Sequence, residues 1–167
     1  GTVLLLSGTQ NNINVSGLFR LVSCTLDDAG KVVSISGNVF NSGIHTGSGR
    51  IVLNGTSVQT INGNGIFQNL ELDNTNAATA PVSLLAGTTI NGILTFSEDK
   101  LFNISTFNLH LTATASIAGS SSTRFIQTAG NAGDGGLSRA YAAVSQFTFP
   151  VGVSGRYTPA TIGFTAA

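Results

Sequence analysis

The amino-acid sequence predicts an all-β protein, a parallel β-helix (β-solenoid) with a C-terminal capping or β-sandwich-like section. Three observations lead to this class. A phrase of sequence recurs, short strand-like segments follow one another along the chain, and apolar residues seldom recur at helical spacing. A fixed period in a strand-rich chain indicates one supersecondary unit stacked on itself.

The recurring phrase begins near residue 1 and returns about 48 residues later. Its landmarks pair Val3 with Ile51, Ile13 with Ile61, Gly17 with Gly65 and Phe19 with Phe67. Because the phrase is long enough for several strands, we expect it to hold two coils of roughly 20–25 residues. Residues 1–120 are therefore assigned to β-solenoid coils with a double-coil repeat of about 48 residues.

The expected strands are short and rich in Val, Ile, Leu, Phe and Thr, which suit a pleated, half-buried surface. In chain order they are residues 2–7, 18–26, 31–36, 50–53, 65–72, 82–85, 92–96, 107–112, 124–128, 146–150 and 158–164. Asn-Gly pairs such as Asn54–Gly55 and Asn91–Gly92 separate them and mark turns. Asn-Gly also closes antiparallel hairpins, so a sandwich remains the alternative to the solenoid.

The composition changes after about Gly119. Residues 129–136 hold four glycines and are expected to form a loop, and the last segment carries both tyrosines. Residues 121–167 are therefore assigned to a Gly-rich loop and a closing β section that leads to a following module. A start on an apolar strand and an end without a cap suggest a segment of a longer polypeptide.

Charge and composition exclude several function classes. Charged residues make up 8% of the chain, against roughly 25% in ordinary soluble domains. Seven basic and seven acidic side chains cancel, so no field attracts nucleic acid, and no nucleic-acid partner is expected. Apolar runs such as Val3–Leu6 are too short to cross a membrane as a helix, so the chain is not expected to span one.

One pair of acidic residues merits attention as a candidate site. Glu71 and Asp73 are two positions apart, so they share one face of a regular strand. Paired carboxylates on a β-helix are the machinery of several polysaccharide hydrolases. The alternative, which we favour, is that both face solvent and alternate with buried Leu70 and Leu72.

The remaining polar residues suggest structural roles. Asp27 and Asp28 precede a glycine and fit a turn in which Asp accepts backbone N–H groups. His45 is expected in a loop and His110 on an exposed strand face, and two isolated histidines do not make a zinc site. Cys24 is the only cysteine, so no internal disulfide is possible. We find no catalytic constellation and expect neither an enzyme nor a cofactor.

Weak carbohydrate contact is the one binding role that the residues suggest. Glu71 and Asp73 offer polar groups, and Tyr141 and Tyr157 are the only tyrosines on which a sugar ring would stack. Such a platform would be small.

Several segments resemble the coil phrase of very large secreted surface proteins of Bacteroidetes. They are residues 53–74, 89–96 and 107–112, with residues 122–130, 133–139, 147–152 and 156–160 resembling the closing section. The resemblance implies the β-solenoid portion of an adhesin-like protein exported by the type IX secretion pathway. The implied location is extracellular or at the cell surface, associated with the outer membrane of a Gram-negative cell.

These observations favour a non-catalytic structural or adhesive stalk segment of a large exported cell-surface protein. Its expected partners are flanking domains of the same polypeptide, with surface polysaccharide, the secretion machinery and further copies of the chain as other candidates. Two alternatives remain open. One is a self-assembling extracellular β-solenoid filament subunit, and the other is a carbohydrate-active β-helix that uses Glu71 and Asp73.

Overall fold

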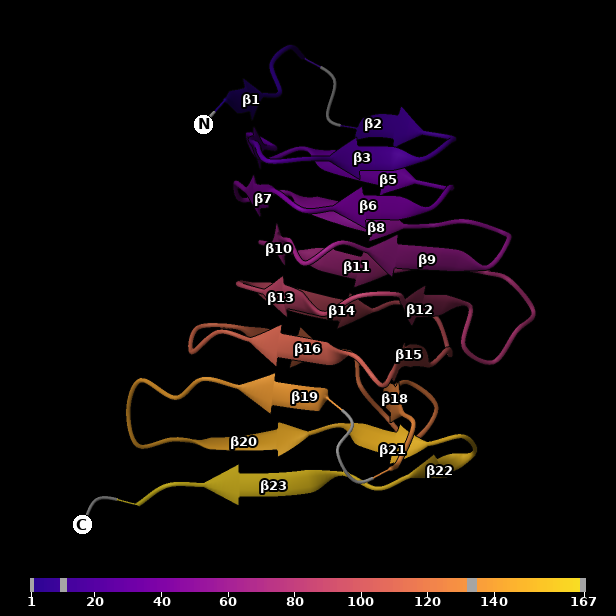
Figure 1. Cartoon of the computed structure of the whole chain (residues 1–167), viewed down its shortest axis with the longest axis vertical. Helices are drawn as coiled ribbons and strands as arrows, with labels where there is room; N and C mark the ends of the chain where they lie inside the picture. Colours follow the sequence, from indigo (N-terminus) through magenta and orange to yellow (C-terminus); the bar gives the residue numbers. More distant parts are fainter. Residues whose placement is uncertain (1, 10–11, 132–134, 166–167) are drawn as a thin grey trace.

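A computed structural model describes residues 2–9, 12–131 and 135–165 of the chain. Within these residues the protein contains only strands and no helix (Figure 1). Nearly all strand pairs are parallel and stack into a β-solenoid of about seven coils. The predicted fold class is therefore confirmed, and the predominance of parallel pairs excludes a hairpin sandwich.

Three long sheets form the sides of the solenoid in the described residues. The first sheet runs β1 (Val3–Leu5), β4 (Thr25–Asp27), β7 (Ile44–Thr46), β10 (Ile66–Phe67), β13 (Thr88–Ile90), β16 (Asn108–Leu111) and β19 (Gly136–Arg139). The second runs β2 (Asn12–Val15), β5 (Val32–Ile35), β8 (Arg50–Leu53), β11 (Leu70–Leu72), β14 (Ile93–Phe96) and β17 (Ser116–Ala118). The third runs β3 (Phe19–Leu21), β6 (Val39–Asn41), β9 (Gln59–Asn62), β12 (Val82–Leu84), β15 (Phe102–Ser105), β18 (Ile126–Thr128), β21 (Val151–Val153) and β22 (Arg156–Tyr157).

Antiparallel pairs are found at the C-terminal end of the stack. There β22 pairs with β21, and β20 (Gln146–Phe149) pairs with β23 (Ala160–Gly163). Both pairs lie at the lower end in Figure 1. Parallel pairing nevertheless extends beyond residue 120, because β18, β19 and β21 each join a parallel ladder. The centre of the expected Gly-rich loop, residues 132–134, lies outside the described residues.

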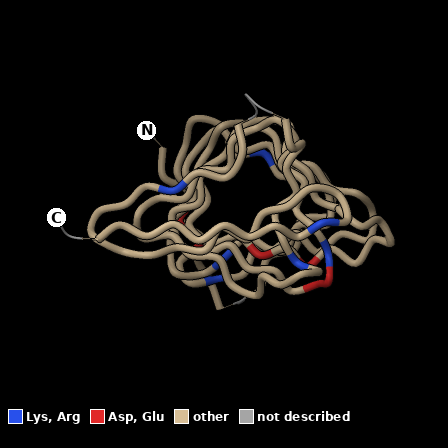
Figure 2. The backbone as a smooth tube through the Cα atoms, turned by 90° about the horizontal axis from the view of Figure 1, so that it is seen from below, with Lys and Arg blue, Asp and Glu red and all other residues tan. Residues whose placement is uncertain are grey.

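The core consists of side chains stacked in register from coil to coil. In each strand alternate residues point inward, so parallel pairing places them above one another. On the first sheet the register gives an inward row of Leu4, Leu26, His45, Phe67, Ile90, Leu111 and Arg139. Seen along the long axis the coils superimpose (Figure 2). Each fully buried aliphatic or aromatic side chain contributes roughly 1.5–3 kcal/mol.

The 48-residue spacing does not mark two whole coils. Val3 lies on β1 of the first sheet, whereas Ile51 lies on β8 of the second. True coil partners of Val3 are Thr25 and then Ile44, so successive coils take 22 and 19 residues. An offset of 48 residues therefore leads from one strand to a strand that lies two coils further along and on the next sheet. The phrase recurs because similar strands and turns follow one another on every side of the solenoid.

One close approach explains a corner glycine. Gly63 has a φ of +86°, and a Cβ there would lie 2.2 Å from the backbone oxygen of Asn41 in the coil before. Glycine fits here because it lacks a Cβ. The turn signals thus form corners between sheets in place of hairpins. In the part of the chain that is described, no helix is long and apolar enough to cross a membrane.

Candidate functional site

Glu71 and Asp73 lie on the outer side of the second sheet. Glu71 is the central residue of β11, between Leu70 and Leu72, which are both buried. Asp73 follows directly, and its backbone N–H donates to the carbonyl of Leu53 on the coil before. The predicted alternation of acidic and buried residues is therefore confirmed.

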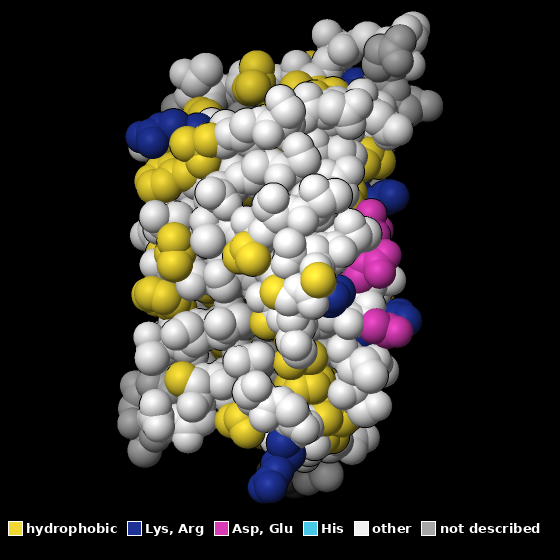
Figure 3. All heavy atoms as spheres, turned by 90° about the vertical axis from the view of Figure 1, so that its right-hand side faces the viewer, with side chains coloured by type: hydrophobic (Ala, Val, Ile, Leu, Met, Phe, Trp, Pro, Cys, Tyr) yellow, Lys and Arg dark blue, Asp and Glu magenta, His cyan; other side chains and the backbone are white. Residues whose placement is uncertain are grey.

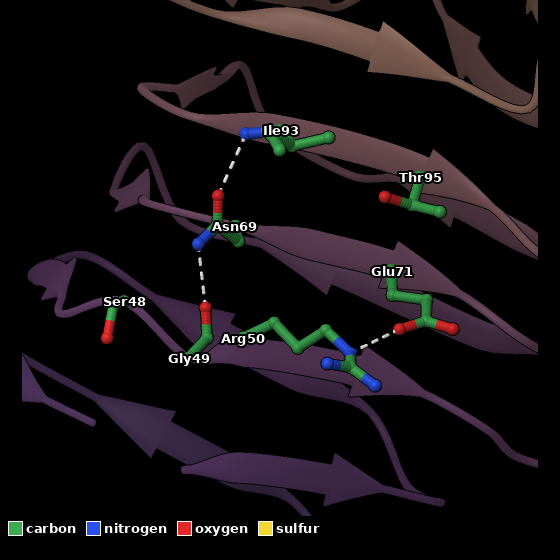
Figure 4. A pocket seen from close by; sticks show the side chains of 7 residues that line it. All are labelled: Ser48, Gly49, Arg50, Asn69, Glu71, Ile93 and Thr95. Atoms are coloured by element: carbon green, nitrogen blue, oxygen red, sulfur yellow. Dashed lines mark hydrogen bonds and ion pairs between the residues drawn. The ribbon is translucent and has the colours of Figure 1, made fainter. Parts of the chain in front are cut away.

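Both carboxylate oxygens of Glu71 are engaged. Arg50 Nε donates to Glu71 Oε2 at 2.5 Å (Figure 4). Ser97 Oγ donates to Glu71 Oε1 at 2.7 Å. Arg50 comes from the coil before, and Ser97 from the coil after. The side chain of Glu71 thus joins three coils across the outer face of the sheet.

A shallow depression of about 350 Å³ lies beside this ion pair. It is lined by Ser48, Gly49, Arg50, Asn69, Glu71, Ile93 and Thr95 (Figure 4). Asn69 bridges coils at its edge, because its Nδ2 donates to the carbonyl of Gly49 at 2.7 Å and its Oδ1 accepts from the N–H of Ile93 at 3.0 Å. The surface offers polar groups suited to hydroxyl-bearing molecules, but Asp73 is not among its lining residues.

The pKa of Asp73 is raised above its ordinary value. Partial burial is the main cause, and the charges of Glu71 and Glu98 add to it. The Asp73 carboxyl therefore keeps its proton to a higher pH than an ordinary aspartate does. Acidic side chains also gather, beside basic ones, along one edge of the face shown in Figure 3.

The two tyrosines do not belong to this site. Tyr157 lies on β22, and its ring centroid is 5.3 Å from that of Phe125. Tyr141 follows β19 and meets Phe164 edge-on at 4.7 Å. The structure brings Glu71 and Asp73 together and places both tyrosines among the C-terminal strands.

Sequence reasoning missed two polar side chains at inward positions of the first sheet. His45, expected in a loop, lies on β7 and is fully buried with Asp28, so that expectation is wrong. A three-residue strand between glycines looks like a loop, and only the stacking of neighbouring coils reveals it. The second group is Arg139, which ends the inward row of the first sheet. The expected turn role of Asp28 is confirmed by its acceptance of the Gly30 N–H.

Comparisons with known protein families, curated proteins and solved structures found no match for this chain. Among the described residues, no group of three or more His, Cys, Asp or Glu side chains is placed to hold a metal ion. The features of this chain that bear on function are the solenoid itself, the C-terminal strands and the depression beside the Arg50–Glu71 ion pair, called the Glu71 surface below.

Proposed function

We propose that this chain is a non-catalytic structural and adhesive stalk segment of a large exported cell-surface protein. The observation that carries the proposal is the unbroken parallel pairing of strands through about seven coils. Neighbouring strands are about 4.8 Å apart, so such a stack extends roughly 30 Å along its axis. Its inter-strand hydrogen bonds run along the same direction as the stack.

The continuous core and the low charge support a structural, non-catalytic role. Side chains of the three sheets fill one continuous core, and the few charged residues are scattered along the coils (Figure 2). Repeat proteins of this kind serve as extended surfaces more often than as self-contained catalysts. The proposed neighbours are flanking domains of the same polypeptide, and the Glu71 surface is the proposed contact for surface polysaccharide.

The proposed location is extracellular, at the surface of a Gram-negative cell, after export by the type IX pathway. The support is the resemblance of the coil segments to Bacteroidetes surface proteins. Antibodies against the chain, applied to intact cells before and after external protease treatment, test this directly. We expect labelling of intact cells that protease removes. Labelling only after lysis would contradict the location.

The intact mass of the native polypeptide tests the stalk role itself. The 167 residues alone weigh 17.0 kDa, and a stalk segment requires a parent protein that is many times larger. We expect the antibody to detect such a protein in untreated cell extracts made with protease inhibitors. A native mass equal to that of the segment would overturn the stalk role.

A second candidate function is a carbohydrate-active β-helix, favoured by the raised pKa of Asp73 beside Glu71. The chain is incubated with purified surface polysaccharides, and reducing ends are counted. A hydrolase predicts release that the double variant Glu71→Gln, Asp73→Asn abolishes. The stalk role predicts no release from either protein.

A further inference from the structure

A second and more apolar cavity lies at the C-terminal end of the solenoid, with a volume of about 500 Å³. Its lining comes from β18, β19, β20, β21 and β23 and the segments beside β19 and β23. The residues are Thr128, Leu137, Ser138, Arg139, Tyr141, Phe149, Val151, Ala160, Ile162 and Phe164. Most of the wall is aliphatic or aromatic, and one residue carries a charge.

That charge belongs to Arg139, which lies at an inward position of β19 and is partly buried. Register pairs it with Leu111, the preceding member of the inward row of the first sheet. Its guanidinium lies over the ring of Phe147, 4.4 Å from the centroid. Nη2 donates to the carbonyl of Ala113 at 3.0 Å, and Nη1 donates to the carbonyl of Ala115.

Within the described residues, Arg139 forms no ion pair, in contrast to Arg50 and Arg124, which each bind a carboxylate. Two further donors are unsatisfied. Arg139 Nε and the hydroxyl of Tyr141 are both buried without a hydrogen-bond partner in the described structure. A buried donor without an acceptor is unfavourable, and the partly buried guanidinium has no carboxylate partner for its charge.

We propose that this cavity binds a small apolar carboxylate, with the anionic head at Arg139 and Tyr141. A carboxylate supplies the missing negative charge and accepts two parallel N–H bonds from a guanidinium. The apolar body lies against Leu137, Phe149 and Ile162. The cavity volume is in the range of small-molecule sites, which are mostly apolar with a few polar groups that fix orientation.

The wall composition selects this ligand class over a sugar. A sugar needs many hydrogen-bonding partners, whereas the uncharged polar lining here is limited to Thr128, Ser138 and the Tyr141 hydroxyl. The cavity therefore differs from the polar surface beside Glu71. The two proposals are independent, because a stalk does not require a small-molecule site.

Titration calorimetry with 2-naphthoate as the probe tests the proposal on the whole chain. We expect saturable binding, and binding at least tenfold weaker for 2-naphthylmethanol, which has a similar shape and no charge. Arg139→Met is expected to weaken naphthoate binding at least tenfold. The matched control is Arg156→Met, because Arg156 lies on β22 and does not line the cavity.

Tyr141→Phe provides a milder variant if Arg139→Met does not fold, as circular dichroism would show. It removes one hydroxyl and is expected to weaken naphthoate binding severalfold while leaving naphthylmethanol binding unchanged. Absence of naphthoate binding to the folded wild-type chain would overturn the proposal. Equal affinity for acid and alcohol, or wild-type naphthoate affinity in both the Arg139 and Tyr141 variants, would also overturn it.

Discussion

At the scale of single residues, Asp28 and His45 form a buried polar pair inside an apolar stack. Asp28 Oδ1 accepts the N–H groups of Gly30 at 2.8 Å and Gly49 at 2.9 Å, and Oδ2 lies 2.9 Å from His45 Nε2. The N–H of Gln68 donates to His45 Nδ1 at 3.3 Å. His45 is therefore neutral, with its proton on Nε2, because Nδ1 acts as an acceptor.

This pair predicts a loss of stability in mild acid. Burial lowers the pKa of His45 below 6.5, against the opposing effect of Asp28. The unfolded chain thus takes up a proton near pH 6.5, whereas the folded chain does so only at lower pH. The free energy of unfolding is therefore fully retained above about pH 6.5 and falls as the pH drops from there toward the folded pKa.

Urea denaturation between about pH 5.5 and pH 8 measures this effect. We expect the wild-type free energy of unfolding to decrease toward the acid end, and His45→Gln to flatten that slope. His110→Gln is the control, because His110 is only partly buried and bonds to the Ser138 hydroxyl. A slope that His45→Gln leaves unchanged would contradict the prediction.

Asp73 is expected to change the free energy of unfolding with pH in the opposite direction to His45. Its folded pKa is raised by burial and by neighbouring carboxylates, so the folded state disfavours the charged form at neutral pH. Asp73→Asn is expected to increase the free energy of unfolding at pH 7 by up to about 0.5 kcal/mol, the range of surface substitutions. The gain is expected to vanish below the unfolded pKa of 3.8. A decrease at pH 7, measured by urea denaturation, would show that the carboxylate is stabilising.

At the scale of elements, the sequence predicts strongly apolar strands well and coil corners poorly. Arg50–Leu53 is predicted with the observed bounds of β8. Residues 18–26 are predicted as one strand but form β3 and β4 on different sheets, because the corner at residues 22–24 takes only three residues. Gln59–Asn62 is missed altogether, since its polar residues give no strand signal until coils stack.

The missed strand β9 contains a polar anchor. The side chain of Gln59 is buried. Its Oε1 accepts the N–H of Gly55 at 2.9 Å and an amide hydrogen of Asn74 at 2.7 Å. Its Nε2 donates to the carbonyls of Ile35 and Gly37. One side chain thus holds two coils and the long turn after β11.

Gln59→Leu is therefore expected to be strongly destabilising. Leucine is similar to glutamine in size but leaves the hydrogen-bond partners of Gln59 unsatisfied. Each buried polar group without a partner lowers the free energy of unfolding by roughly 1–3 kcal/mol. We expect a loss of at least about 2 kcal/mol in urea denaturation. Gln127→Leu on β18 is the control, because Gln127 is on an outward position and only half-buried. Equal effects of the two substitutions would argue against the anchoring role.

At the scale of the whole molecule, the candidate site was only partly predictable. The carboxylate pair follows from a spacing of two residues, because strand alternation alone places Glu71 and Asp73 on one face. The partners of Glu71 do not follow, because Arg50 and Ser97 reach it from other coils. Arg139 was also hidden, since a charged residue at an inward position is revealed only by the register of β16 and β19.

The first coil exposes apolar side chains that are covered in later coils. Leu4 heads the inward row of the first sheet yet is 53% exposed, whereas Leu26, its partner in the next coil, is 2% exposed. Within the described residues, β1, β2 and β3 each end their sheet and present an unpaired edge. Apolar surface beside unpaired strand edges favours association.

The isolated chain of residues 1–167 is therefore expected to self-associate through this coil. Sedimentation over a hundredfold range of concentration tests the prediction, with species larger than the monomer rising with concentration. Leu4→Lys adds a charge to the exposed end and is expected to shift the chain toward monomer. Val58→Lys is the matched control, because Val58 is 55% exposed but lies between β8 and β9, away from that end. A monomer at every concentration would exclude the filament alternative. Equal effects of both lysines would exclude end-to-end contact through this coil.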